Sequence, residues 1–271
     1  MKELSTKHYW DNRYSEDSIK NKNKSNLGIK KHFIRIFKKA PWNETLVERH
    51  RWVICDRYLP KDNNFRLMEI GCAPGNFLLS YHKRYGYEPW GIDYSHIGVE
   101  KTQENFKNYG IKSDNVIEAD FFSSVISQKF NNFFDVVTSH GFIEHFDDPE
   151  NVIKRHVDLL KVGGFLIVSI PNLRCFNYFR VYLTFPEKIS LHNLKIMKIN
   201  IFKTLFSNPK LGLEELYIGY FGTITFRHFF PNWVPDFASM LEKFVWLLVR
   251  DRGFETSFFS PQIIYIGRKI H

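Results

Sequence analysis

Apolar and polar positions follow a regular alternation between residues 66 and 170. Segments with helical spacing at 76–85, 96–109 and 149–160 separate short apolar runs that have the length and composition of strands. These runs are RLMEIG (66–71), PWGID (89–93), NVIEAD (115–120), FFDVVTS (133–139) and GFLIVSI (164–170). Strands that alternate with helices of this length predict βαβ units and a parallel sheet.

The alternation stops after residue 170. Residues 171–230 are aromatic and basic without the earlier pattern, and they precede an apolar helix-like segment, 237–254, that contains Gly253 near its end. Two strands are predicted after it, at 254–259 and 262–268, joined in a hairpin around Pro261. The chain therefore predicts an α/β fold with a seven-stranded, mostly parallel sheet whose last strand is antiparallel.

The N-terminal part of the chain adds further predicted elements. A short amphipathic helix is predicted at 7–14, a polar loop at 14–31 and a helix at 44–58. We expect four parts: an N-terminal basic segment and cap (1–43), a cofactor-binding core (44–170), an acceptor-binding insertion or lid (171–230), and a C-terminal helix with the final strands of the core (231–271).

Charge and composition narrow the class of protein. The net charge is +9, but it is uneven, since residues 1–66 carry 16 basic and 8 acidic side chains whereas residues 67–170 carry 9 and 14. Basic flanks fit nucleic acid, anionic lipid or a phosphorylated substrate, and equally a solvated surface. We see no run of apolar residues long enough to span a membrane, and the three cysteines have no metal-ligand spacing. We expect a reduced, cytoplasmic protein, with peripheral membrane contact as an option.

The stretch LMEIGCAPGNF (67–77) carries the first candidate chemistry. A strand that ends in a glycine turn and leads into a helix offers free backbone amides to a nucleotide cofactor. The dinucleotide spacing G-x-G-x-x-G/A fails because its third position is Asn76, and no Gly-Lys-Ser/Thr follows to make a phosphate-binding loop. Gly71, Ala73 and Gly75 instead fit G-x-G-x-G with alanine at the middle position.

This loop and four later motifs resemble the class I S-adenosylmethionine-dependent methyltransferases, from about residue 45 to the C-terminus. LMEIGCAPG looks like the family's first motif, and GID looks like its acid at the end of the second strand. EADFF looks like the third-strand motif, and FDVVTSHGFIEHFDDP looks like the fourth strand with the loop after it. LLKVGGFLIVSIPN looks like the entry to the fifth strand. The resemblance implies a Rossmann-like methyltransferase fold with an insertion after the fifth strand, and S-adenosylmethionine as cofactor with S-adenosylhomocysteine as product. The cofactor-binding residues it implies are Glu69, Gly71, Cys72, Ala73, Gly75, Asp93, Tyr94, Asp120, Phe121 and His140.

Three histidines are candidates for the catalytic base that an oxygen acceptor requires. His140 and His145 lie in the loop after the fourth strand, where ligands bind in such sheets, and His228 lies at the end of the insertion. His145 alternatively makes a structural hydrogen bond, and His140 alternatively lines the cofactor pocket. Quinone-pathway relatives carry Glu-x-x-Glu-His here as a proposed metal site. Since Gly141 stands at the first acidic position, we predict no metal.

Missing motifs exclude some classes of methyl acceptor. The chain lacks the Asp/Asn-Pro-Pro-aromatic motif of amino-methylating DNA enzymes and the Pro-Cys dipeptide of carbon-5 pyrimidine enzymes. The resemblance favours the glycan and small-molecule O-methyltransferase branch, with a saccharide or other small polar acceptor, anionic or lipid-linked. The aromatic insertion was expected to build the acceptor pocket. The alternative is an RNA methyltransferase or nucleic-acid-binding protein that uses the basic flanks.

Overall fold

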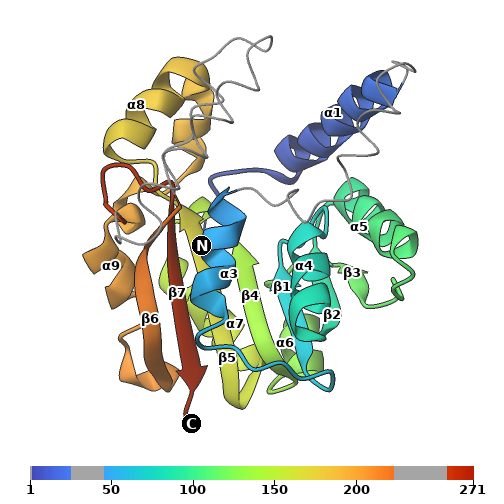
Figure 1. The fold of residues 1–271 in the computed structure, drawn as a ribbon, viewed down its shortest axis with the longest axis vertical. Helices are drawn as coiled ribbons and strands as arrows, with labels where there is room; N and C mark the ends of the chain where they lie inside the picture. Colours follow the sequence, from blue (N-terminus) through green and yellow to red (C-terminus); the bar gives the residue numbers. More distant parts are fainter. Residues whose placement is uncertain (1, 26–45, 223–254) are drawn as a thin grey trace.

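A seven-stranded sheet forms the centre of the molecule (Figure 1). The computed structural model describes residues 2–25, 46–222 and 255–271. The strand order is β3-β2-β1-β4-β5-β7-β6. The strands are β1 (Arg66–Ile70), β2 (Glu88–Asp93), β3 (Val116–Glu118), β4 (Phe134–His140), β5 (Leu160–Pro171), β6 (Leu213–Phe221) and β7 (Gln262–Lys269). Strands β1 to β5 pair in parallel, and β7 runs antiparallel to both β5 and β6, which confirms the predicted fold class.

Helices cover both faces of this sheet and create two apolar cores. Because successive side chains of a strand point to opposite faces, Leu67 enters one core and Met68 the other. The helix α3 (Leu46–Cys55) precedes β1, and the helices between the strands are α4 (Asn76–Tyr85), α5 (His96–Asn108), α6 (Ser124–Phe130) and α7 (Pro149–Leu159). Their connections follow the predicted βαβ pattern and bring the carboxyl ends of β1, β2 and β4 to one edge of the sheet.

The sixth strand differs from the prediction. It is β6, inside the segment expected to be a lid, whereas residues 257–259 form a turn. The prediction at 254–259 followed the strand propensity of an aromatic run. In the structure, the edge of β7 that this run would need is already paired with β6. The predicted helix at 237–254 lies outside the described residues.

Two helical segments stand beyond the carboxyl edge of the sheet (Figure 1). One is α1 (Lys7–Ser25), which is longer than predicted because it continues through part of the expected loop. This stretch is polar but contains neither glycine nor proline, so nothing in it terminates a helix. The other is α8 (Cys175–Thr184), which begins the excursion between β5 and β6. The excursion continues through η2 (Pro186–Leu191), η3 (Leu194–Met197), α9 (Ile199–Thr204) and η4 (Pro209–Leu211), and α9 packs beside β6.

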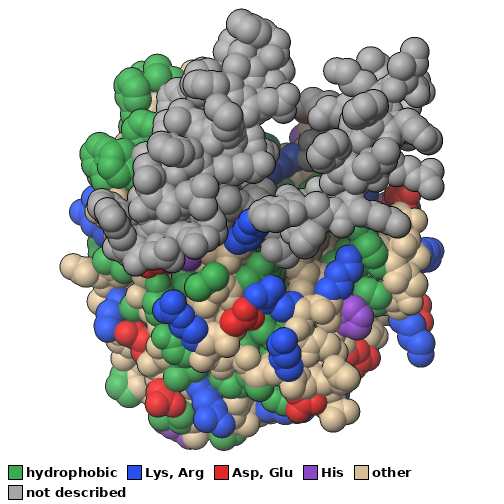
Figure 2. Space-filling view, viewed as in Figure 1, with side chains coloured by type: hydrophobic (Ala, Val, Ile, Leu, Met, Phe, Trp, Pro, Cys, Tyr) green, Lys and Arg blue, Asp and Glu red, His purple; other side chains and the backbone are tan. Residues whose placement is uncertain are grey.

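The surface shows where this excursion is apolar. Several side chains of α8 are exposed, among them Phe179, Tyr182 and Leu183, and hydrophobic side chains gather over this helix in Figure 2. Around the strands, basic and acidic side chains are interspersed on the same face (Figure 2). None of the helices that the structure describes is long and apolar enough to cross a membrane.

Candidate active site

The glycine loop between β1 and α4 has the tight geometry that its sequence predicts. Gly71 and Gly75 have φ values of +68° and +85°, a region that favours glycine. A Cβ atom on Gly75 would lie 2.6 Å from the side chain of Thr102, so the helix α5 packs directly against the loop. Cys72 is buried within this contact, and burial holds the pKa of its thiol well above the usual range. The thiol therefore packs and is not activated as a nucleophile.

Asp93, at the end of β2, connects the loop to the next helix. Its Oδ2 accepts a hydrogen bond from the backbone N–H of Ala73 (3.1 Å), and its Oδ1 accepts one from the N–H of Ser95 (2.9 Å). The carboxylate is 5% exposed and lines the large cavity described below. Burial raises its pKa, while these two N–H groups act in the opposite direction. The remaining lone pairs of its oxygens are able to accept hydrogen bonds from a ligand.

A wall of the cavity follows β3. Tyr94, Asp120 and Phe121 all line it, as the resemblance implied. Asp120 is exposed at its rim, and its Oδ1 accepts a hydrogen bond from the N–H of Phe122 (2.8 Å). Phe121 is buried and its ring lies 5.0 Å from that of His156, which fixes an aromatic surface beside an acceptor oxygen. This combination suits a flat heterocycle with an amino group.

Glu69 faces a buried cation that the sequence did not identify. Arg51, on α3, is 3% exposed, and its guanidinium carbon lies 4.2 Å from the centre of the Phe77 ring. Burial raises the pKa of Glu69 and lowers that of Arg51, and each charge counteracts the shift of the other. Arg51 lines the cavity, so a fixed positive charge and a carboxyl group lie together beside the glycine loop.

His140 is held on both sides of its ring. Nη1 of Arg51 lies 2.7 Å from Nδ1, the hydroxyl of Ser169 lies 2.8 Å from the same nitrogen, and Thr138 Oγ1 lies 3.1 Å from Nε2. An arginine only donates, so Nδ1 carries a lone pair and Nε2 the proton. Burial, and then the Arg51 charge, hold the pKa of His140 well below its usual range. These contacts favour its predicted role in lining the pocket over that of a base.

His145 lies in a cluster with two other ionisable groups. It belongs to η1 (Ile143–His145) with Glu144, and the ring of His192, from the insertion, lies 4.7 Å from its own. Burial lowers the pKa of His145 to about 4 and raises that of Glu144 to about 8. All three residues line the cavity. Of the predicted bases, His228 lies outside the described residues.

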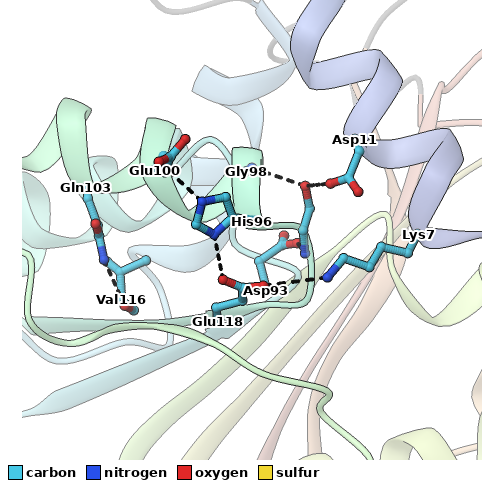
Figure 3. A network of polar contacts seen from close by, with 10 residues as sticks. Lys7, Asp11, Asp93, His96, Gly98, Glu100, Gln103, Val116 and Glu118 are labelled. Carbon is cyan, nitrogen blue, oxygen red and sulfur yellow. Dashed lines mark hydrogen bonds and ion pairs between the residues drawn. The ribbon is translucent and has the colours of Figure 1, made fainter.

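The helix α1 covers this region from the N-terminal side. The hydroxyl of Tyr14 donates to the carbonyl oxygen of Ala73 (3.2 Å), and Asp11 contacts the hydroxyl of Ser95. Figure 3 shows Asp11 beside the end of β2, with Lys7 pointing to Glu118 at 3.5 Å. Since Trp10, Arg13 and Tyr14 line the cavity, the predicted cap lies over the cofactor loop.

A single cavity of about 1200 Å³ unites these groups. Its walls come from the glycine loop, the ends of β2 and β4, α1, and Pro171 and His192 next to and within the insertion. Seven aromatic residues were expected to build the acceptor pocket, but none of them lines this cavity: Phe176, Tyr178, Phe179, Tyr182, Tyr217, Tyr220 and Phe221. Most of them face outward on α8 or lie on β6, and the described residues of the segment 171–230 that line the cavity are Pro171 and the polar His192.

The sequence of this chain is similar to those of known methyltransferases. The sequence model of a methyltransferase domain matches residues 51–206. An uncharacterized methyltransferase of Schizosaccharomyces pombe is 27% identical over 143 residues, which is 47% of this chain and 49% of the relative. A ubiquinone biosynthesis O-methyltransferase of a Shewanella species is 26% identical, over 40% of this chain and 44% of the relative. The chain thus spans about half the length of these relatives.

The fold is also shared with solved structures. A structure described as an S-adenosylmethionine-dependent methyltransferase from Archaeoglobus fulgidus aligns with a TM-score of 0.53 at 18% identity, over 80% of this chain and 92% of that one. The predicted enzyme class and cofactor are therefore confirmed at the level of the family. With its family match over more than half of its residues and its seven-stranded sheet with an antiparallel last strand, the chain belongs to the S-adenosylmethionine-dependent methyltransferases of class I fold.

Proposed function

We propose that this chain transfers the methyl group of S-adenosylmethionine to a hydroxyl oxygen of a small polar acceptor, with a sugar or glycan as the expected class. The observation that carries this proposal is the buried cluster of Glu144, His145 and His192 in the same cavity as the glycine loop. Methyl transfer needs donor and acceptor to be aligned, and a hydroxyl acceptor must also lose its proton.

The cofactor's groups match the walls of the cavity. The methionine part is a zwitterion, and Arg51 lines the cavity as a basic group, whereas the carboxyl of Glu69 is buried and does not line the cavity. Asp93 supplies the carboxylate for the ribose hydroxyls. Asp120 and Phe121 supply an acceptor and an aromatic surface for adenine. This arrangement supports the cofactor-binding residues that the resemblance implied.

His145 is the base that we propose. Its Nδ1 lies 2.7 Å from the carbonyl oxygen of Leu191, which only accepts, so Nδ1 carries the proton and Nε2 the lone pair. Burial lowers its pKa to about 4, so the ring is neutral near pH 7 and its Nε2 lone pair is available, but the same burial makes it a weak base. Oε1 of Glu144 lies 4.0 Å from Nε2, and because burial raises the pKa of Glu144 to about 8, this carboxyl would stabilise the protonated ring only once it ionises.

The size of the cavity favours a small acceptor. Ligand sites usually occupy about 300–1,000 Å³. The cavity of about 1200 Å³ is therefore large enough for the cofactor with a small acceptor beside it. Attachment of the acceptor to a lipid, and with it a peripheral membrane contact, stays a prediction. It is supported by the exposed Phe179, Tyr182 and Leu183 of α8.

Transfer of a tritiated methyl group to fractions of the source cell tests the acceptor class. We expect label in saccharides or other small hydroxyl compounds. His145→Gln should lower kcat by about 10²-fold with adenosylmethionine affinity unchanged, as removal of a general base does. His96→Gln, at an exposed histidine outside the cavity, is the control. Label confined to RNA, with steeply salt-dependent binding, would establish the nucleic-acid alternative.

A further inference from the structure

The Glu144, His145 and His192 cluster has the composition of a metal site. One ligand atom from each residue lies within 4.8 Å of the others, although His192 is distant from the other two in the sequence. The insertion is held against η1 at this point, because the N–H of Asn193 donates to the carbonyl oxygen of Glu144 (2.7 Å). The three side chains are therefore brought together by the backbone and not by a chance contact of long side chains.

Both histidines are fixed in the tautomer that a metal requires. His192 repeats the arrangement of His145, since its Nδ1 lies 2.6 Å from the carbonyl oxygen of Lys188. Each Nδ1 must therefore carry the proton, which leaves each Nε2 with a free lone pair. Histidines that bind metals commonly donate their second N–H to a backbone carbonyl in this way, which orients the ring.

Glu144 supplies a carboxyl group with an unused oxygen. Its side chain is 1% exposed, and its Oε2 has no hydrogen-bond partner within the part of the chain that the structure describes. A buried oxygen without a partner is costly. A Cβ atom on Gly141 would lie 3.4 Å from Oε1, so an acidic side chain at 141 would have to share this space. The expectation of no metal rested on residues 141–145 alone and did not include His192.

We propose that Glu144, His145 and His192 bind a divalent transition-metal ion, with Zn²⁺ as the expected occupant and a further coordination position toward the cavity. Two imidazoles and one carboxylate are a donor set of zinc sites that keep an open position. Tetrahedral coordination with bonds of about 2.0–2.2 Å places ligand atoms about 3.4 Å apart. The ligand atoms must therefore approach one another by up to about 1.4 Å from the observed separations of up to 4.8 Å.

Arg13 opposes this site and provides a sharp test of it. Arg13, on α1, lines the same cavity as the cluster. Burial is the main cause that lowers the pKa of both histidines, the charge of Arg13 adds to it, and this positive charge also disfavours a dication at their Nε2 atoms. Removing this charge should therefore tighten metal binding, whereas removing a ligand should weaken it. The two changes have opposite signs, which a general loss of folding would not produce.

The site would deepen the proposed function, on which this one step depends. A cation bound beside the acceptor lowers the pKa of a coordinated hydroxyl, so the proton is lost more readily. His145 would then hold the ion through Nε2, the proton of the coordinated hydroxyl would pass to solvent water, and the ion would replace the base role proposed for His145. Metal binding is measured without methyl transfer, so a chain that methylates a hydroxyl but binds no ion would refute the metal site and leave the proposed function standing.

The experiment uses the full chain, stripped with a chelator and dialysed. Titration with ZnCl₂ by calorimetry and metal analysis of the dialysed complex should give one ion per chain. Co²⁺ should give the visible absorption of a four-coordinate site. His192→Gln, which is able to keep the contact with Lys188, should weaken binding about 10²-fold, and Glu144→Gln should do likewise. Arg13→Gln should tighten it severalfold.

His96→Gln is the matched control, since His96 is an exposed histidine whose nitrogens lie 2.7 Å and 3.3 Å from Glu118 and Glu100. It should leave the affinity unchanged. The proposal is overturned if the wild type binds no ion, or if His192→Gln and Glu144→Gln bind as tightly as the wild type. It is equally overturned if His96→Gln alone removes binding, because the ion would then be on the surface.

Discussion

Replacing Asp93 with alanine removes a carboxylate that has one structural and one proposed ligand-binding task. The structural task is to accept hydrogen bonds from the N–H groups of Ala73 and Ser95, which hold the glycine loop against the end of β2. The proposed task is to accept hydrogen bonds from the ribose hydroxyls. The two tasks can be separated because a neighbouring residue shares only the first.

The expected loss follows from these contacts. A hydrogen bond to a charged group contributes about 1.5–3 kcal/mol. Two ribose hydroxyls would add about 3–6 kcal/mol, part of which water in the open cavity replaces, so we expect a loss of about 3 kcal/mol or roughly 150-fold in affinity. The loop N–H groups left without an acceptor should also lower the free energy of unfolding by about 2 kcal/mol.

Calorimetry with S-adenosylhomocysteine measures this loss. The titration is best performed at pH 8, since burial raises the pKa of this carboxyl and ionisation must be complete. Ser95→Ala is the control: its hydroxyl caps α5 by accepting from the N–H of Gly98 (3.1 Å), so its loss costs about 1 kcal/mol of stability but leaves the carboxylate in place. Its affinity should stay within about threefold of the wild type.

A 2′-deoxy analogue of S-adenosylhomocysteine, which lacks one ribose hydroxyl, tests the proposed contact with Asp93 directly. The wild type should bind this analogue about tenfold or more weakly than the parent compound, whereas Asp93→Ala should hardly distinguish the two. If the folded Asp93→Ala protein binds the product within threefold of the wild type, the ribose assignment is wrong. If it still distinguishes the two compounds as the wild type does, the hydroxyl is bound by another residue.

Three further predictions concern other groups around the cavity. Burial lowers the pKa of His156 to about 4, so the unfolded chain takes up a proton that the folded chain refuses below pH 6.5, and stability falls as the pH falls. Relative to His156→Leu, the wild type should lose about 2 kcal/mol of its free energy of unfolding between pH 7 and pH 5, measured by urea unfolding. If the difference in unfolding free energy between the two proteins is the same at both pH values, the pKa of His156 is not lowered. Arg51→Met should weaken the product about 10- to 100-fold but leave affinity for its decarboxylated analogue unchanged; equal weakening of both would contradict the carboxylate contact. Tyr14→Phe loses the hydrogen bond to Ala73, so dissociation of the product, measured by stopped flow, should accelerate about fivefold. An unchanged dissociation rate would show that α1 does not control release of the product.

The sequence predicted the groups that lie at the carboxyl ends of the central strands. Gly71 follows β1 directly, Asp93 ends β2 and Asp120 lies two residues beyond β3, and a parallel sheet brings such positions to one edge whatever the rest of the chain does. For these residues a local pattern determines the place in the fold. The prediction that the last strand is antiparallel is confirmed by β7, but the hairpin with 254–259 from which it was derived does not form, because residues 257–259 are a turn.

Residues whose position depends on packing between distant segments could not be predicted. The sequence pattern gives Arg51 as part of an ordinary helix face, and only the packing of α3 against the sheet places it in the cavity. His192 joins Glu144 through contacts of the insertion that no spacing announces. Strand β6 was missed for a different reason: its alternation is interrupted by a bulge between Glu215 and Tyr217.

The contacts of α1 have a kinetic consequence for catalysis. Because Trp10 and Tyr14 line the cavity while Asp11 and Lys101 connect α1 to α5, a product bound in the cavity would be covered by a helix whose removal breaks several polar contacts at once. Product exit and opening of this helix then become one step, of the kind that limits turnover in many enzymes. Substitutions along α1 would change the turnover number without touching any group that takes part in methyl transfer, so the rate of this enzyme is adjustable at a distance from its chemistry.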